Sequence, residues 1–239
     1  FPIAPGILAL PLYLISVAAG AAVNEQFLHH LSKISGAVLT AFSALALRQA
    51  LAGRCSKSWG LALSFLYGLG SWAFSVSSQA LWQHSTAQLG VALGLWGLSR
   101  EGRRFDALAG FGFALALASR PDNVFFLLAA AVYGLFWARS KLPGMAAGAA
   151  LPLGLLAWYW VAYTGRLLPP ESEFQARIFG DFQWQAFAGL IASPTRGLLW
   201  FFPAAVFGVF AVWRSRDARV KVMATACAAL WGMLCFYEA

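Results

Sequence analysis

The stretch VALGLWGLSREGRRFDALAGFGFALALASRPDNVFFLL, residues 91–128, shows the pattern on which the fold of this chain depends. Apolar runs alternate there with two short loops of different character. The loop at residues 100–106 (REGRRFD) is basic, whereas the loop at residues 118–123 (ASRPDN) is compact and carries proline, aspartate and asparagine. Apolar runs of about 17–20 residues are long enough to cross a hydrocarbon core of about 30 Å. The stretch therefore predicts consecutive membrane-crossing helices.

The composition extends this pattern to the whole chain. The 239 residues are 60% hydrophobic and 11% charged, with a mean hydropathy of +0.68, whereas soluble domains carry about 25% charged residues. A single signal peptide cannot account for apolar runs that recur along the full length. The sequence therefore predicts an all-α fold, a polytopic transmembrane helical bundle that forms one domain over residues 1–239. About eight spans are expected, near residues 34–50, 59–75, 85–99, 105–118, 124–138, 143–163, 198–213 and 220–237.

The loops between these runs differ in charge. Twelve of the 17 Lys and Arg lie in residues 48–58, 100–106, 139–141 and 214–221, which we call the basic loops. The other loops hold six of the nine acidic residues and all three histidines. Because positive charge favours the cytoplasmic side of a membrane, the basic loops are expected inside and the others outside. The net charge of +8 then reflects topology, and no nucleic-acid partner is expected.

Two segments depart from a simple series of spans. Residues 6–23 contain Pro11 and follow the sequence PIAP, so they fit a helix lying in the outer interface as well as a span; we prefer the interfacial helix. Residues 164–197 form a loop of more than 30 positions. Loops of that length are usually functional or disordered, and this one holds too many aromatic residues for disorder. An amphipathic helix that only lies on the bilayer would also account for it.

The chemically capable side chains gather in the loops expected outside. His84 and Gln88 form an i,i+4 pair at the start of a span, after Gln83. Arg120 follows a span directly, and a lipid-linked phosphate would explain an arginine there because guanidinium binds phosphate through two nitrogens. Arg196 in the sequence SPTRG (193–197) lies just before the next span, and phosphate contact would explain it for the same reason.

For each of these clusters a structural explanation stays open. The His84 segment could be an ordinary helix start with Trp82 at the interface. Asp122 could cap the helix that begins after Asn123, and Ser193 could cap the following span. The candidate ligand-binding residues are Gln83, His84, Arg120, Asp122, Asn123, Ser193 and Arg196.

Other site signals are weak. The pair His29 and His30 with Glu25 has no metal-ligand spacing that carries weight, and no metal site is predicted. No Walker loop, nucleophile elbow or paired-cysteine motif is present. Cys55, Cys227 and Cys235 do not form a disulfide framework and are expected to be small core residues. No acidic residue lies in the middle of a span, which argues against a proton-coupled transporter.

Four stretches together carry a resemblance to a known family. The chain resembles bacterial members of the GT-C superfamily, multi-pass glycosyltransferases related to protein mannosyltransferases and aminoarabinose transferases. The stretches, in order, are FPIAPGILALPLYL (1–14), SSQALWQHSTAQLGVALGL (77–95), ASRPDNVFFLL (118–128) and GLIASPTRGLLWFFPAAVFG (189–208).

The resemblance implies an enzyme of the bacterial cytoplasmic membrane with an extracytoplasmic active face. It would move a sugar from a polyprenyl-phosphate-linked donor to a cell-envelope glycan, lipid or protein. Arg120 and Arg196 would contact phosphate, and Gln83, His84 and Asn123 would contact sugar or acceptor. In that family the catalytic aspartate lies upstream of the first stretch, so the general base is expected before Phe1 and the chain is expected to be a fragment. No cofactor is predicted, and a divalent metal stays open.

Two other functions compete with glycosyl transfer. A transporter or flippase for a lipid-linked sugar would also gather cations near a phosphate, but it predicts polar groups continuing through the membrane. A non-catalytic membrane scaffold predicts that the outer loops do not converge. A separation of His84, Arg120 and Arg196 beyond about 20 Å, too far for one ligand, would favour the scaffold.

Overall fold

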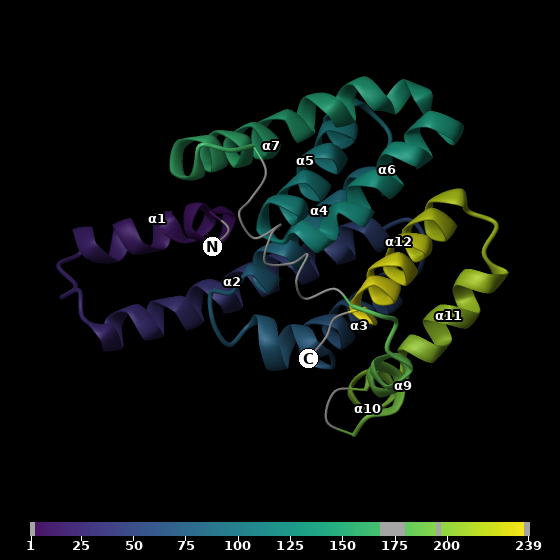
Figure 1. The fold of residues 1–239 in the computed structure, drawn as a ribbon, viewed down its shortest axis with the longest axis horizontal. Coiled ribbons are helices and arrows are strands. Elements are labelled where there is room, and N and C mark those ends of the chain that lie inside the picture. Colours follow the sequence, from purple (N-terminus) through teal and green to yellow (C-terminus); the bar gives the residue numbers. More distant parts are fainter. Residues whose placement is uncertain (1–2, 168–179, 195–196, 237–239) are drawn as a thin grey trace.

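The computed structural model describes residues 3–167, 180–194 and 197–236, and within these ranges every regular element is a helix (Figure 1). The prediction of an all-α chain is confirmed for this part of the protein. The α-helices are α1 (Ala4–Ala18), α2 (Glu25–Leu51), α3 (Lys57–Leu69), α4 (Gln83–Ser99), α5 (Arg103–Ser119), α6 (Val124–Trp137), α7 (Leu142–Thr164), α9 (Trp184–Ala192), α10 (Leu198–Phe201), α11 (Ala205–Arg214) and α12 (Ala218–Leu234). The short π and 3-10 turns are η1 (Ala73–Ser77), η2 (Pro121–Asn123) and η3 (Arg139–Lys141).

A helix occupies each of the eight expected spans, but two of them are interrupted. The expected span at 59–75 is α3, which ends at Leu69 because Gly70 lies at its C-cap, and the turn η1 follows. The expected span at 198–213 is divided into α10 and α11, and Pro203 lies between them. Proline has no backbone N–H and disfavours helix in the residue before it, so a break is expected at this position.

Helices α4, α5 and α7 pack at very short range through glycines. A Cβ atom on Gly90 of α4 would lie 2.6 Å from the backbone nitrogen of Ala116 on α5. A Cβ atom on Gly94 would lie 2.6 Å from the ring of Phe113, which is fully buried. Gly110 of α5 meets the backbone of Met145 on α7 in the same way. Small residues that let helix backbones approach are typical of membrane bundles.

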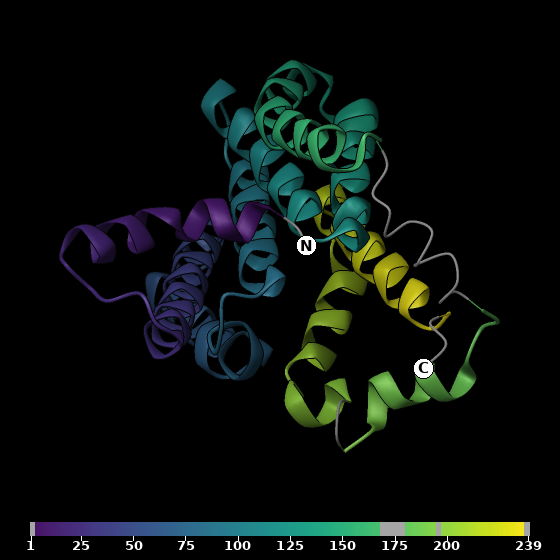
Figure 2. The same cartoon turned by 60° about the vertical axis from the view of Figure 1, so that its left-hand side comes forward.

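The core lies around this helix contact. Helix α2 packs against α4, with α1 beside them, and α12 packs against α6 (Figure 2). The main buried cluster joins α4, α5, α6, α7 and α12, and its buried members are Leu98, Ala109, Phe113, Phe126, Ala129, Ala130, Tyr133, Met145, Met223 and Ala226.

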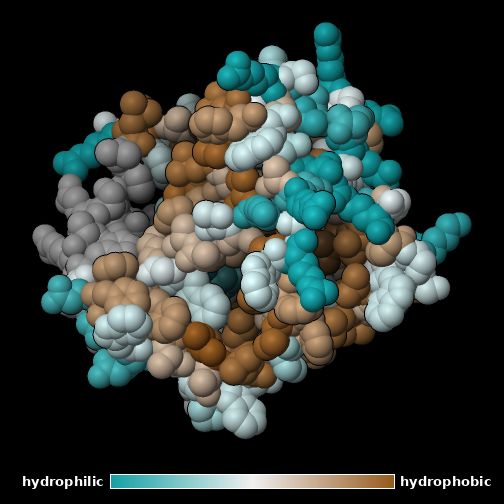
Figure 3. All heavy atoms as spheres, turned by 90° about the vertical axis from the view of Figure 1, so that its right-hand side faces the viewer, coloured by the Kyte–Doolittle hydropathy of each residue, from teal (hydrophilic) through white to brown (hydrophobic). Residues whose placement is uncertain are grey.

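The four basic loops contact one another at one end of the bundle. Lys141 binds Glu101 at 2.8 Å and Asp106 at 3.1 Å, and Arg54 binds Asp217 at 3.2 Å. Figure 3 looks onto the right-hand side of Figure 1, where the loop between α11 and α12 lies, and shows hydrophilic side chains beside apolar surface. The basic loops thus lie together at one end of the bundle, as expected if successive loops lie at alternate ends. The side of a membrane that it faces stays a prediction.

Helix length and hydropathy mark candidate membrane crossings. Among the described residues, two helices are both long and apolar enough to cross a membrane, Glu25–Leu51 and Arg139–Thr164. Three further apolar helices are shorter: Ala4–Ala18, Pro121–Trp137 and Ala205–Arg214. At 1.5 Å per residue, the 15 residues of α1 span about 22 Å and the 14 residues of α6 span about 21 Å, so helix length does not separate an interfacial α1 from an expected span. The number of spans therefore stays a prediction.

Candidate functional site

His84 and Arg120 reach the same point from two different turns. Trp82 is extended, and α4 begins at Gln83, so His84 is the second residue of that helix. Helix α5 ends at Ser119, Arg120 is extended, and the 3-10 turn η2 then leads into α6. Both turns lie at the end of the bundle away from the basic loops, because α4 and α5 run antiparallel between them. The predicted convergence of these two outer loops is therefore present.

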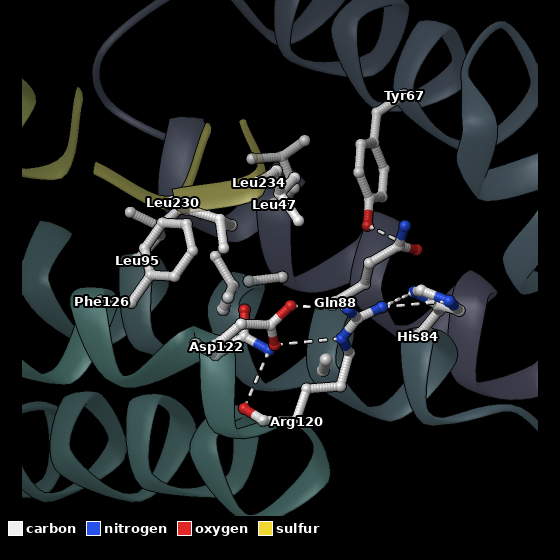
Figure 4. A pocket seen from close by; sticks show the side chains of 14 residues that line it. Leu47, Tyr67, His84, Gln88, Leu95, Arg120, Asp122, Phe126, Leu230 and Leu234 are labelled. Atoms are coloured by element: carbon white, nitrogen blue, oxygen red, sulfur yellow. Dashed lines mark hydrogen bonds and ion pairs between the residues drawn. The ribbon is translucent and has the colours of Figure 1, made fainter. Parts of the chain in front are cut away.

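Three side chains form a hydrogen-bonded cluster at this point (Figure 4). The Nε and Nη2 atoms of Arg120 donate to the Oδ1 and Oδ2 atoms of Asp122 at 3.1 and 2.6 Å. The Nη1 atom of Arg120 lies 2.7 Å from Nδ1 and 3.1 Å from Nε2 of His84. A neutral imidazole offers one acceptor nitrogen, so one ring nitrogen accepts from Arg120. Asp122 thus binds Arg120 in a bidentate pair, and the alternative explanation that it caps a helix does not hold.

The electrostatics of the cluster favour the neutral form of His84. Burial lowers the pKa of His84 because it disfavours the charged ring, and the charge of Arg120 lowers it further, while Asp122 partly opposes the shift. The carboxylate of Asp122 is 13% exposed and neutralises Arg120, which is 26% exposed. An incoming anion must therefore share Arg120 with Asp122 or displace the carboxylate of Asp122. The guanidinium has five N–H groups, so some of them remain for a ligand.

The cluster stands at the polar end of a cavity of about 490 Å³, which we call the outer cavity. Figure 4 shows its polar side chains on one side and leucines on the other. The cavity lies between α2, α3, α4, α6 and α12. Its lining residues are Leu47, Tyr67, His84, Ala87, Gln88, Val91, Ala92, Leu95, Arg120, Asp122, Asn123, Phe126, Leu230 and Leu234. A site of this size with an apolar wall and one polar end fits an amphiphilic ligand.

A second polar group lies deeper in the same cavity. The hydroxyl of Tyr67 donates to Oε1 of Gln88 at 3.4 Å and lies 3.1 Å from the hydroxyl of Ser43. Sequence reasoning singled out Gln88 through its spacing from His84 but missed Tyr67. Tyr67 lies in an apolar run, and no local signal distinguishes it from a packing residue. Its position opposite Gln88 depends on how α3 folds back onto α2 and α4.

The other candidate residues have separate roles. Asn123 lines the cavity, but its amide donates to the carbonyl oxygens of Ala116 and Arg120, both at 3.4 Å, and so closes the end of α5. Gln83 and Ser193 do not line the cavity; Ser193 follows the last residue of α9. Arg196 lies outside the described residues.

The described part of the long loop is anchored beside the outer cavity. The backbone N–H of Gln183 donates to the carbonyl of Cys235 at 2.8 Å, and Phe187 stacks on Trp231 with ring centroids 6.2 Å apart. Leu230 and Leu234, on the same helix α12, line the cavity. Phe182 likewise contacts the ring of Phe236, with centroids 5.3 Å apart, while Phe174 and Phe179 of the same loop lie outside the described residues.

No group of three or more His, Cys, Asp or Glu side chains is close enough to hold a metal ion within the part of the chain that the structure describes.

Comparisons with known protein families, curated proteins and solved structures find no match to this chain. The resemblance to GT-C glycosyltransferases therefore stays an expectation.

Proposed function

We propose that this chain belongs to a polytopic protein of the bacterial cytoplasmic membrane that binds a polyprenyl-phosphate-linked sugar and transfers the sugar on the extracytoplasmic face. The observation that carries the proposal is the cluster of Arg120, Asp122 and His84 at the polar end of an otherwise apolar cavity. Arg120 would hold the phosphate, and the leucine wall would hold the first part of the prenyl chain.

The surface of the helices supports a membrane location. Large apolar side chains point outward from helices that form the outside of the bundle. Trp213 and Phe207 on α11 are 80% and 78% exposed, and Trp158 on α7 is 61% exposed. Contiguous apolar surface of this kind marks contact with lipid or with a partner. A surrounding lipid bilayer would account for exposed apolar surface on several helices at once.

In transfer chemistry the cluster would act on the leaving phosphate. Breaking the bond between sugar and phosphate leaves negative charge on the phosphate oxygens, and a fixed guanidinium stabilises that charge. Asp122 holds Arg120 in place through two hydrogen bonds. Deprotonation of the acceptor hydroxyl needs a base, and we assign that role to none of the residues described here.

The proposal is tested by donor binding and transfer in the full-length protein. The variant Arg120→Gln is expected to lower affinity for polyprenyl phosphate by about tenfold or more, since a charge-assisted hydrogen bond contributes about 1.5–3 kcal/mol. Affinity for the uncharged polyprenol should not change. Lys33→Gln is the matched control, because Lys33 is an exposed cation at the same end that does not line the cavity. The proposal is wrong if donor affinity and transfer rate are unchanged in both Arg120→Ala and Arg196→Ala.

Transport of a lipid-linked sugar is the second candidate, and one observation favours it. A further cavity of about 170 Å³, which we call the inner cavity, lies at the end that carries the basic loops. Leu47 and Leu95 line both cavities, so the two cavities adjoin at these side chains. Transport predicts that Leu47→Ala and Leu95→Ala raise the rate of lipid movement across the bilayer. A transferase that does not move lipid predicts no such increase in the rate of lipid movement.

A scaffold without ligand has less support. It predicts that the three outer loops do not converge. Two of them do meet, with Nη1 of Arg120 2.7 Å from Nδ1 of His84, while the third, at Arg196, lies outside the described residues.

A further inference from the structure

The inner cavity combines apolar walls with two arginines at its rim. Arg54 comes from the loop after α2, and Arg219 lies at the start of α12. The other lining residues are Leu47, Ala50, Leu51, Leu95, Leu98, Ser99, Val220 and Met223. A cavity with these walls has space for hydrocarbon and offers almost no hydrogen-bonding groups to a sugar.

One carboxylate holds the two arginines together. Arg219 donates from Nε to Oδ1 of Asp217 at 3.0 Å and from Nη2 to Oδ2 at 2.9 Å, while Arg54 reaches the same Oδ2 atom at 3.2 Å. These bonds to Arg219, followed by that to Arg54, lower the pKa of Asp217 to about 2, although burial acts against the shift. Asp217 is therefore ionised at neutral pH. Two guanidiniums and one carboxylate carry a net charge of +1.

Arg219 is fixed further by the end of α4. Its Nη1 atom donates to the carbonyl oxygen of Leu98 at 3.3 Å, and Leu98 also lines the cavity. The two guanidiniums are thus held at the mouth of the apolar space before any ligand arrives. Such preorganisation lowers the cost of ordering the site on binding.

The surroundings add to the positive charge. The four basic loops hold 12 Lys and Arg and only three acidic residues, Glu101, Asp106 and Asp217. Arginine binds phosphate oxygens through two nitrogens, and basic pockets between helices on the cytoplasmic side are suited to anionic lipid headgroups. An anionic phospholipid joins these two requirements, since it carries a phosphate next to a hydrocarbon chain.

We propose that the inner cavity binds an anionic phospholipid of the cytoplasmic leaflet, with one acyl chain between α2, α4 and α12 and the phosphate held by Arg54 and Arg219. This site differs from the outer cavity in its end of the bundle and in its charged residues. It requires that the chain lies in a membrane, but it does not require transfer activity.

The test measures lipid binding by native mass spectrometry of the protein in a neutral detergent. The unmodified protein is expected to bind phosphatidylglycerol about tenfold more tightly than phosphatidylcholine. The double variant Arg54→Gln/Arg219→Gln should lose about 10–30-fold in affinity for phosphatidylglycerol, because each basic residue near an anionic lipid contributes about 1 kcal/mol. Its affinity for phosphatidylcholine should fall much less, because the choline cation offsets the charge of the phosphate.

Arg103→Gln/Arg104→Gln is the matched control, since it removes the same charge from exposed residues at the same end that do not line the cavity. Its affinity for phosphatidylglycerol should fall less than about threefold, because salt screens exposed charges beyond about 10 Å. Met223→Trp fills the cavity without a change of charge and should weaken phosphatidylglycerol binding in a protein that keeps both arginines. It tests the site even if the double arginine variant does not fold.

Three results would overturn this assignment. One is equal affinity of the unmodified protein for the two phospholipids, and another is an equal loss in the Arg54/Arg219 variant and in its control. The third is displacement of phosphatidylglycerol from this cavity by polyprenyl phosphate at a lower concentration, which would make the cavity the inner end of a transport path.

Discussion

At the scale of single residues, the contact between His84 and Arg120 could be anticipated from the sequence only in part. Charge alternation indicated that both residues face the same side, but they are 36 positions apart and no local pattern fixes their distance. Aspartate is a common helix cap, but Asp122 binds the side chain of Arg120 instead. Two hydrogen bonds between a carboxylate and a guanidinium are stronger than one hydrogen bond from a backbone N–H. Tyr67 gave no signal, because its role comes from tertiary packing.

The lowered pKa of His84 makes a prediction about stability and pH. A group whose pKa is lower in the folded chain than its ordinary value of 6.5 contributes stability above that pH, and the contribution is lost as the pH falls through the lowered pKa. We therefore expect the thermal unfolding temperature of the protein to fall between pH 7.5 and pH 5 more steeply than that of His84→Gln. His29 and His30 are present in both proteins, so they do not contribute to the difference between the two curves. Parallel curves for the two proteins would contradict the assigned environment of His84.

Asp122→Asn should separate ligand affinity from stability. Asn cannot carry the charge that neutralises Arg120, so the guanidinium becomes available to an anionic ligand. We expect affinity for polyprenyl phosphate to rise severalfold while the free energy of unfolding falls by about 1–3 kcal/mol. Binding titrations and chemical unfolding measure the two effects on the same sample. A loss of affinity would instead place Asp122 in direct contact with the ligand.

At the scale of helices, the sequence predicted where apolar segments lie better than how they end. Most helices match the expected ranges closely, because the change from apolar to charged residues marks their boundaries. Two exceptions lie at Gly70 and Pro203, where the backbone rather than the polarity ends the helix. A third is α2, which begins at Glu25 rather than near residue 34 because the side chain of Asn24 caps it. The order of packing, with α5 against α4, α6 and α7, depends on glycines whose partners lie in other helices. A single sequence does not show such pairs.

Gly90→Val tests the close contact between α4 and α5. The added side chain meets the backbone of α5 at Ala116 and Gly112, which cannot move like the end of a flexible side chain. We expect destabilisation of about 1–3 kcal/mol from overpacking, together with weaker ligand binding, since α4 and α5 position His84 and Arg120. Gly154→Val on α7 is the control, because a Cβ atom there has no atom within 4 Å. Equal stability of the two variants, measured by thermal unfolding in detergent, would rule out the tight contact.

At the scale of the whole molecule, the charge pattern predicts the topology. In a protein whose native cysteines are replaced, Ser56→Cys and Ser140→Cys in the basic loops should react with a membrane-impermeant maleimide only when the cytoplasmic side is exposed. Ser78→Cys, just after η1, should react only from the outside. Labelling in intact cells and in inverted vesicles distinguishes the two sides. Reaction of all three positions from the same side would exclude the predicted arrangement.

The central claim, that the outer cavity holds the lipid part of a polyprenyl phosphate, is tested most directly by photo-crosslinking. A polyprenyl phosphate that carries a diazirine on its first isoprene units is bound to the purified protein and irradiated, and the labelled residues are found by mass spectrometry. We expect label on Leu230, Leu234 and the other leucines of the cavity wall, competition by unlabelled polyprenyl phosphate, and loss of label in Arg120→Gln but not in Lys33→Gln. Label confined to the outward apolar faces of α7 and α11, with no effect of Arg120→Gln, would contradict the claim.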